Sequence, residues 1–271
     1  MGFKGSTPLG TEGNPQACES SWRPCLSVYS PEPQRRPPVE ECPGQRFQVS
    51  QLLFHLHSAL GPGPDVLLQP YLSSWDELIK FMESLGPVVE FFSQKVKSKV
   101  SLLRGLARQD WEGRAETGGE KGEDGGPVGG PYTSVRSMMR WELARGAVDF
   151  RRQTGSGCRT LLRLHRALLW LQLFLRGMGE EPGAGGRPQS PSELCREAYG
   201  RALAPHHPWL LRQAAELAFL AMPEWDTFFQ LVCVQSHQEA GPVLDRVVRA
   251  IEEVYSRTQG ALEEHGMLEL P

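Results

Sequence analysis

The residues best suited to bind a charged group lie on one predicted helix, residues 156–178. Arg159, Arg163, Arg166 and Trp170 follow one another at spacings of four, three and four residues, which places them on a single stripe of a helix. Most of the remaining surface of this helix is Leu, Phe and Ala. Converging guanidinium groups suit a phosphate or a carboxylate. For this helix alone, an amphipathic helix with a solvated arginine edge is the commoner explanation.

The chain as a whole is close to neutral, and its basic character is local. Its 271 residues are 39% hydrophobic and 23% charged, with a formal net charge of −3, which is typical of a globular protein of one domain or two small ones. This balance argues against a nucleic-acid partner. Between residues 145 and 176, seven arginines are opposed by Asp149 alone. Such an asymmetry indicates one anionic ligand or surface.

The sequence lacks the common motifs of catalytic, cofactor and metal sites. It contains no HExxH, GxSxG or GxGxxG motif and no phosphate-binding Gly-rich loop followed by Lys-Ser or Lys-Thr. His55 and His57 have no cysteine or carboxylate spaced to complete a metal site. We therefore expect no metal and no cofactor. The six cysteines form no CxxC pair, which favours free thiols in a reducing compartment.

The pattern of apolar residues predicts an all-α protein of about eight helices. Residues 1–46 are rich in Pro, Gly, Ser and Glu, so we expect a disordered tail. Residues 47–271 are expected to form one domain, with a flexible Gly- and Glu-rich insertion at 107–130. The helices are expected at residues 47–60, 73–84, 88–106, 134–153, 156–178, 191–203, 208–222, 224–234 and 243–266.

Three blocks of the sequence resemble, in order, the glycolipid transfer protein family. The blocks are YLSSWDELIKFMESLGPVVEFFSQKVKSKVSLL, SGCRTLLRLHRALLWLQLFL and HHPWLLRQA. With the closing EEHGMLELP, the resemblance covers roughly residues 47–271 and is to the branch of the family that binds a lipid phosphate. It implies a two-layer helical sandwich. In that fold the hydrocarbon chains of a lipid enter between the layers, and the headgroup stays in a polar site at the surface.

The resemblance also implies which residues bind the phosphate. Lys99 matches the phosphate-binding lysine of the family, and Arg159 and Arg163 match two arginines of its central helix. Arg151 or Arg152 fits a further arginine on the phosphate side. In the sugar-binding branch, a tryptophan that stacks on the sugar stands where this chain has Arg163. The change from an aromatic ring to a guanidinium favours a phosphate headgroup.

Three further positions concern the rest of the lipid and the membrane. His207 matches a histidine that bonds the amide carbonyl of the sphingoid base, and Trp209 matches a tryptophan placed for membrane contact, which suits its amphipathic ring. Lys95 stands where the family has an aspartate that accepts hydrogen bonds from the lipid amide. Lysine has three donors and no acceptor. The amide half of the expected site therefore departs from the family.

The sequence thus predicts a sphingolipid transfer protein that is not an enzyme and that prefers a phosphorylated headgroup such as ceramide-1-phosphate. We expect it in the cytosol, with peripheral and transient contact to membranes. One alternative is a sensor or carrier of a different anionic lipid. The other is an adaptor that has lost lipid transfer because of Lys95, with the Pro-rich tail as ligand for an SH3-type partner.

Overall fold

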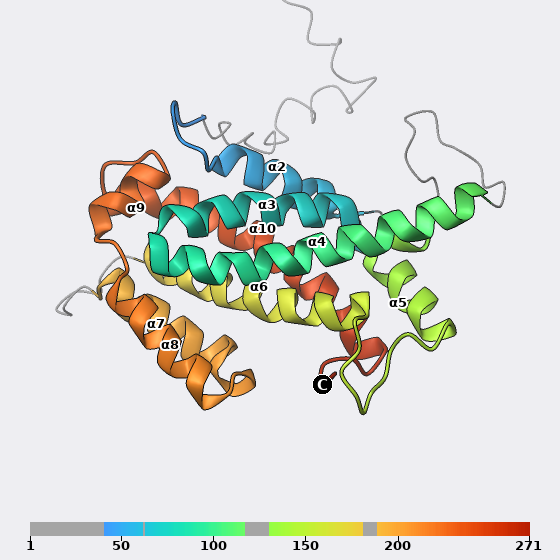
Figure 1. Ribbon diagram of the computed structural model, residues 1–271. Helices are drawn as coiled ribbons and strands as arrows, with labels where there is room; N and C mark the ends of the chain where they lie inside the picture. The colour runs from blue at the N-terminus through green and yellow to red at the C-terminus, as the bar shows by residue number, and fades with distance from the viewer. Residues whose placement is uncertain (1–40, 62, 117–129, 181–188) are drawn as a thin grey trace, which may run out of the picture. The chain divides into compact units, whose positions relative to one another are not determined.

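The computed structural model describes residues 41–61, 63–116, 130–180 and 189–271 (Figure 1). Within these ranges the regular structure is helical. The only β-structure in them is two isolated bridges. None of the described helices is long and apolar enough to cross a membrane. The α-helices are α2 (Val49–Ala59), α3 (Leu68–Ser84), α4 (Pro87–Glu116), α5 (Val135–Ala144), α6 (Gly157–Gly179), α7 (Pro191–Ala202), α8 (Trp209–Leu220), α9 (Trp225–Leu231) and α10 (His237–Glu264).

Five of these helices close around one apolar core. In chain order, α2 packs on α3, α3 on α4 and α4 on α6, and α10 then contacts both α6 and α2. Tyr71, Trp75 and Phe174 are fully buried in this core. Outside the ring, α7 packs on α6, while α8 packs on α7 and touches α4 (Figure 1). This arrangement confirms the all-α class expected from the sequence.

Helix α6 holds a central position because it contacts α4, α5, α7 and α10. Its face toward α10 carries His165, which is 2% exposed. The imidazole Nε2 lies 2.6 Å from the side-chain oxygen of Gln259, and the ring stacks on Tyr255 with 4.1 Å between centroids. Burial lowers the pKa of His165 to about 4, so the ring is neutral at physiological pH. This contact fixes which face of α6 is turned away from α10.

The first turn of α6 is fixed by acceptors for its main-chain N–H groups. The hydroxyl of Ser156 accepts from the N–H of Arg159 at 3.2 Å. The buried carboxylate of Glu142, on α5, accepts from Gly157 at 2.6 Å and Cys158 at 2.9 Å. A Cβ on Gly157 would lie 2.7 Å from this carboxylate, so only glycine permits the approach. An anion here also complements the positive end of the helix dipole.

Two expected helices proved too short. Helix α3 begins at Leu68 rather than at residue 73, because Pro70 lies in the first turn, where its missing N–H costs nothing. Helix α4 continues to Glu116 rather than ending near Leu106, because the segment ARQDWEGRAE consists largely of helix formers. Residues 107–116 of the expected flexible insertion are therefore helical. Residues 117–129 of the insertion and the expected tail up to residue 40 lie outside the described residues.

Two other boundaries were misplaced at glycines. Helix α5 ends at Ala144 rather than near residue 153, because Gly146 takes a left-handed conformation with φ of +67°. Residues 147–155 therefore form a loop before α6. Helix α10 begins at His237 rather than at residue 243, so the Gly241-Pro242 pair lies inside it. Its N-cap is Ser236, and Pro242 is accommodated inside the helix.

The expectation of free thiols is wrong for two cysteines. Cys42 and Cys233, 191 residues apart, form a disulfide. Neighbouring residues join the same two segments, since the side chain of Gln45 donates to the carbonyl of Gln230 at 3.4 Å. Cysteine spacing could not reveal this pairing, because only the packed fold brings the segments together. Cys158 and Cys195 are free and buried, as expected.

Replacing Glu142 by alanine should destabilise the protein by ~2–4 kcal/mol, because it leaves buried N–H groups at the start of α6 without an acceptor. The matched control is Glu112→Ala, which removes an exposed carboxylate on α4 and should change the free energy of unfolding by less than ~0.5 kcal/mol. Urea denaturation of both variants measures the difference. Equal stabilities would show that Glu142 does not hold the start of α6.

Candidate headgroup-binding site

Cationic side chains from two helices converge at one edge of the core. Burial lowers the pKa of Lys99, on α4, and the guanidinium groups of Arg163 and Arg159, on α6, lower it further. Burial also lowers the pKa of Arg163 to about 10, together with its neighbours Arg159 and Arg166. Mutual shifts of this kind require charges that lie close together. The charges of Lys99, Arg159 and Arg163 therefore act on one another across the contact between α4 and α6.

This cationic cluster, Lys99 with Arg159, Arg163 and Arg166, has little acidic compensation. Among the described residues, none of the four forms a salt bridge with an Asp or Glu carboxylate, although nine other such pairs occur. Burial lowers the pKa of Arg166, and the exposed Glu269 partly opposes that effect. The cluster thus keeps its positive charge in a partly buried position, where an anion would be favoured.

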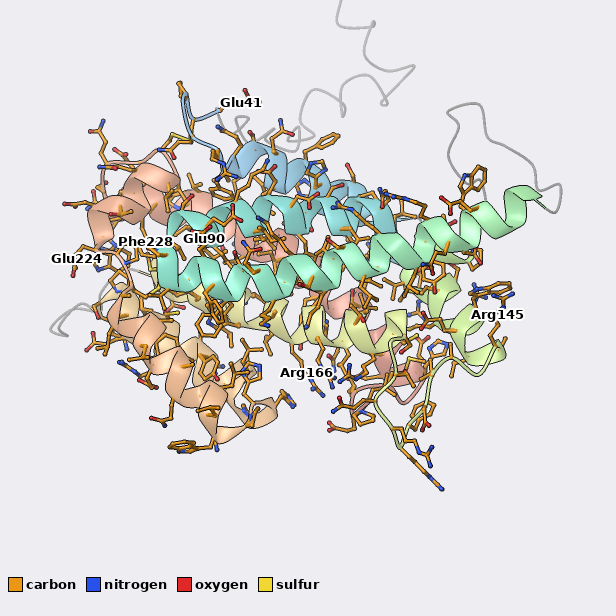
Figure 2. The ribbon with its side chains drawn as sticks, in the orientation of Figure 1. Glu41, Glu90, Arg145, Arg166, Glu224 and Phe228 are labelled. Carbon is orange, nitrogen blue, oxygen red and sulfur yellow. A yellow bond between two sulfur atoms is a disulfide. The ribbon has the colours of Figure 1, made fainter. Side chains whose placement is uncertain are left out.

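Each of the three arginines of the cluster donates a hydrogen bond to a main-chain oxygen. These oxygens come from residues 267–271, here called the strap, which follows the end of α10 and runs along α6. Arg166 projects from α6 toward it (Figure 2). The donor–acceptor pairs are Arg159 with Pro271, Arg163 with Leu270 at 3.1 Å, and Arg166 with Leu268 at 2.6 Å. Sequence reasoning missed this contact, since main-chain acceptors leave no mark on residue types.

His207 lies beside the cluster, between α7 and α8. Burial lowers its pKa, and the charges of His206, Lys99 and Arg163 act in the same direction. Its Nδ1 lies 2.9 Å from the hydroxyl of Tyr199. In the neutral ring, a hydroxyl that donates to Nδ1 leaves the proton on Nε2. His207 can then offer an N–H donor next to the cationic cluster.

Two other predicted residues lie in different surroundings. Lys95 is exposed on α4, one turn before Lys99, and its charge contributes to the lowered pKa of Lys99. Arg152 is exposed in the loop after α5, where its main-chain N–H donates to the carboxylate of Asp149 at 3.1 Å. In the described part of the chain, no hydrogen bond or ion pair joins the Arg152 side chain to the cluster.

The two tryptophans near the site differ in exposure. Trp209, at the start of α8, is 65% exposed and follows His207 by two residues. Its helix also exposes the large apolar side chains of Leu210, Leu217 and Leu220. Trp170 instead packs against the core, with its ring parallel to that of Phe174 at 6.3 Å. Although Trp170 shares the arginine stripe in sequence, its partly buried ring packs against the core.

Two acidic residues of α3 are paired with cations outside the cluster. Asp76 binds Arg104 through two hydrogen bonds of 3.0 and 2.5 Å. Glu77 is paired with Lys80 at 2.5 Å. Neither carboxylate is paired with a member of the cluster. Among the residues that the structure describes, no group of three His, Cys, Asp or Glu could hold a metal ion.

Comparison with known proteins places this geometry in a family. Residues 66–234 match the model of the glycolipid transfer protein family. The ceramide-1-phosphate transfer protein of Xenopus laevis is 35% identical over 231 residues, which cover 84% of this chain and 98% of that protein. The human ceramide-1-phosphate transfer protein is 35% identical over 228 residues, covering 83% of this chain and 97% of that one.

Solved structures agree with these sequence matches. The apo form of mouse ceramide-1-phosphate transfer protein superposes with a TM-score of 0.70 at 34% identity, covering 83% of this chain and all of the other. The human protein in complex with 12:0 ceramide-1-phosphate gives a TM-score of 0.68 at 35% identity, covering 81% of this chain and 97% of that chain. The fold expected from the resemblance is confirmed, and this chain belongs to the glycolipid transfer protein family.

Proposed function

We propose that this protein binds a sphingolipid with a phosphorylated headgroup, ceramide-1-phosphate, and carries it between membranes. The observation that carries the proposal is the partly buried cationic cluster, which has no salt bridge to an acidic side chain in the described residues. Relatives at about 35% identity are ceramide-1-phosphate transfer proteins, and one neighbouring structure contains that lipid. The proposed activity makes and breaks no covalent bond.

In this proposal Lys99, Arg159 and Arg163 bind the phosphate. A guanidinium offers a planar fork of donors that matches two phosphate oxygens, and Lys99 adds a compact charge from the facing helix. The Nε2–H of His207 donates to the amide carbonyl of the lipid. Arg152 remains a prediction as a further phosphate ligand, since it would have to reach the cluster from its exposed loop.

The apolar core between the helices would enclose the hydrocarbon chains. A small apolar pocket already lies inside it, lined in part by Phe81, Leu175 and Phe228. Because a helix rises ~1.5 Å per residue, Leu175 is ~18 Å along α6 from Arg163. Chains that start at the cluster would therefore run toward this pocket. Each buried methylene contributes ~0.8 kcal/mol, which compensates the lipid for leaving a bilayer.

Contact with the membrane would be made by the exposed face of α8. Trp209 and Leu210 begin this helix beside His207, and Leu217 and Leu220 extend its apolar surface. Exposed apolar side chains next to a ligand site are typical of interaction surfaces, and a tryptophan ring suits the membrane–water interface. Binding of this extent would be weak and reversible, as a shuttle that works from the cytosol requires.

A second candidate function is the transport or sensing of an anionic lipid that lacks the sphingoid amide. It is favoured by Lys95, which cannot accept a hydrogen bond from an amide, and by the engagement of Asp76 and Glu77 elsewhere. This lipid would use the same cationic cluster. The adaptor function and its SH3-type partner depend on the Pro-rich segment, which lies outside the described residues.

Transfer between vesicles tests the proposed function directly. The wild type should move ceramide-1-phosphate and leave a neutral glycosylceramide largely in place. Arg163→Leu should lower ceramide-1-phosphate transfer at least ~10-fold, because a charge-assisted bidentate contact is lost. Arg201→Leu, which removes an exposed arginine on α7, is the matched control and should behave as the wild type. Equal transfer of the neutral glycolipid by the wild type would contradict the phosphate preference.

Lys95→Asp should raise ceramide-1-phosphate transfer several-fold, because it restores an acceptor for the lipid amide and removes a charge that repels Lys99. Lys95→Ala separates these two effects, since it removes the cation without adding an acceptor. The same vesicle assay, run with a glycerophosphate lipid in parallel, measures both variants. A drop in ceramide-1-phosphate transfer for Lys95→Asp would mean that the lysine has its own ligand, as in the second candidate function.

A partly buried cation whose role is to bind a ligand should lower the free energy of unfolding when the ligand is absent. The pKa of Lys99 lies below that of an exposed lysine, so its charge opposes folding. Lys99→Met should raise the free energy of unfolding by up to ~1 kcal/mol after allowance for solvent screening. Lys97→Met on the same helix should lower it by ~1 kcal/mol, because Lys97 pairs with the largely buried Glu83. Urea denaturation without lipid measures both, and equal signs would contradict the argument.

A further inference from the structure

We propose that the 267–271 strap is a positioning element of the headgroup site, which holds Arg159, Arg163 and Arg166 in a converging arrangement before the lipid arrives. The inference rests on the proposed function, because it assigns the strap a part in phosphate binding. Its basis is the set of three hydrogen bonds that join successive arginines of α6 to main-chain oxygens of the strap.

The strap is itself firmly placed. Gly266 ends α10 with a φ of +63°, and the N–H of Met267 then donates back to the carbonyl of Leu262 at 2.8 Å. This is a common way for a helix to end and reverse direction. Met267 is completely buried and Leu270 is 3% exposed. Two apolar anchors therefore fix the main chain whose oxygens face the arginines.

The strap and the arginine stripe run in opposite directions. The strap makes these contacts while forming a turn, in which the N–H of Leu270 donates to the carbonyl of Met267 at 3.3 Å. Leu268 and Pro271 are three residues apart and pair with Arg166 and Arg159, so the two segments run in opposite directions with their polar groups in register. A single accidental contact would not show such a correspondence.

The carbonyls of Leu270 and Leu268 can orient Arg163 and Arg166 without neutralising them. A carboxylate partner would cancel the charge that attracts a phosphate, and it would have to be displaced at a cost. A carbonyl carries no net charge and uses one of the five N–H donors of a guanidinium. Arg163 and Arg166 therefore keep donors for the phosphate while repulsion between the cations is opposed.

Fixing the arginines in advance should strengthen lipid binding. An arginine side chain has ~2 kcal/mol of rotamer entropy to lose when it becomes ordered. If the strap has already ordered three such side chains, binding the phosphate no longer carries that cost. The effect should be specific for the headgroup, because the strap contacts the arginines rather than the pocket for the hydrocarbon chains.

The test uses the full chain, a chain that stops after Met267, and two variants of the anchor, Leu270→Ser and Leu270→Met. Each protein is equilibrated with phosphatidylcholine vesicles that contain either ceramide-1-phosphate or ceramide, and the amount of lipid bound to the protein is measured. The truncation and Leu270→Ser should weaken ceramide-1-phosphate binding ~10-fold and ceramide binding less than ~3-fold, while Leu270→Met should restore the wild-type ratio.

Each outcome decides one question. If the truncated chain binds ceramide-1-phosphate as tightly as the wild type, the strap is not a positioning element. If the truncated chain binds this lipid more tightly, the inference also fails, because the strap then competes with the phosphate. Equal losses for both lipids would also overturn the inference, since they would report general damage to the fold. If the wild type binds ceramide-1-phosphate no better than ceramide, the proposed function itself fails.

Discussion

The constraint on which the site depends is the cost of holding several cations together at a partly buried edge of the core. Burial and mutual repulsion both act against this arrangement, and both are visible in the lowered pKa values of Lys99 and Arg163. The surrounding fold opposes that cost. Glu142 and Ser156 fix the start of α6, His165 fixes its rotation against α10, and the strap holds the guanidinium groups. The carbonyl partners of Arg163 and Arg166 carry no charge, so the charge of these two arginines remains available to a ligand.

The same helix also joins the headgroup site to the apolar interior. The arginines occupy its first half, and its later residues line the small apolar pocket of the core. A lipid with its phosphate at the cluster would thus place its chains along α6 without any further recognition element. Helix α8, which exposes apolar side chains beside His207, would bring the mouth of the site to a membrane. Binding of the headgroup, burial of the hydrocarbon chains and docking to the membrane therefore depend on neighbouring helices.

Much of this organisation was predictable from the sequence, and the reasons for the failures are physical. Helical periodicity gave the all-α class and the arginine stripe, because both are local patterns. The resemblance added Lys99 and His207, which no spacing could have joined to Arg163. Hydrogen bonds from the strap use main-chain atoms, and the partners of Cys42 and Arg163 lie far along the chain. Such contacts depend on packing, which residue types do not encode locally. The predicted ends of α3, α5 and α10 were wrong at a proline or a glycine, and the predicted end of α4 was wrong because helix formers continue the helix.

The most direct test of the central claim is a crystal structure of this protein with short-chain ceramide-1-phosphate. The account predicts phosphate oxygens within about 3 Å of Lys99, Arg159 and Arg163, with the hydrocarbon chains between the helices and the strap still bonded to the arginines. A phosphate bound elsewhere, or a cluster that remains without the headgroup while the chains are enclosed, would contradict it.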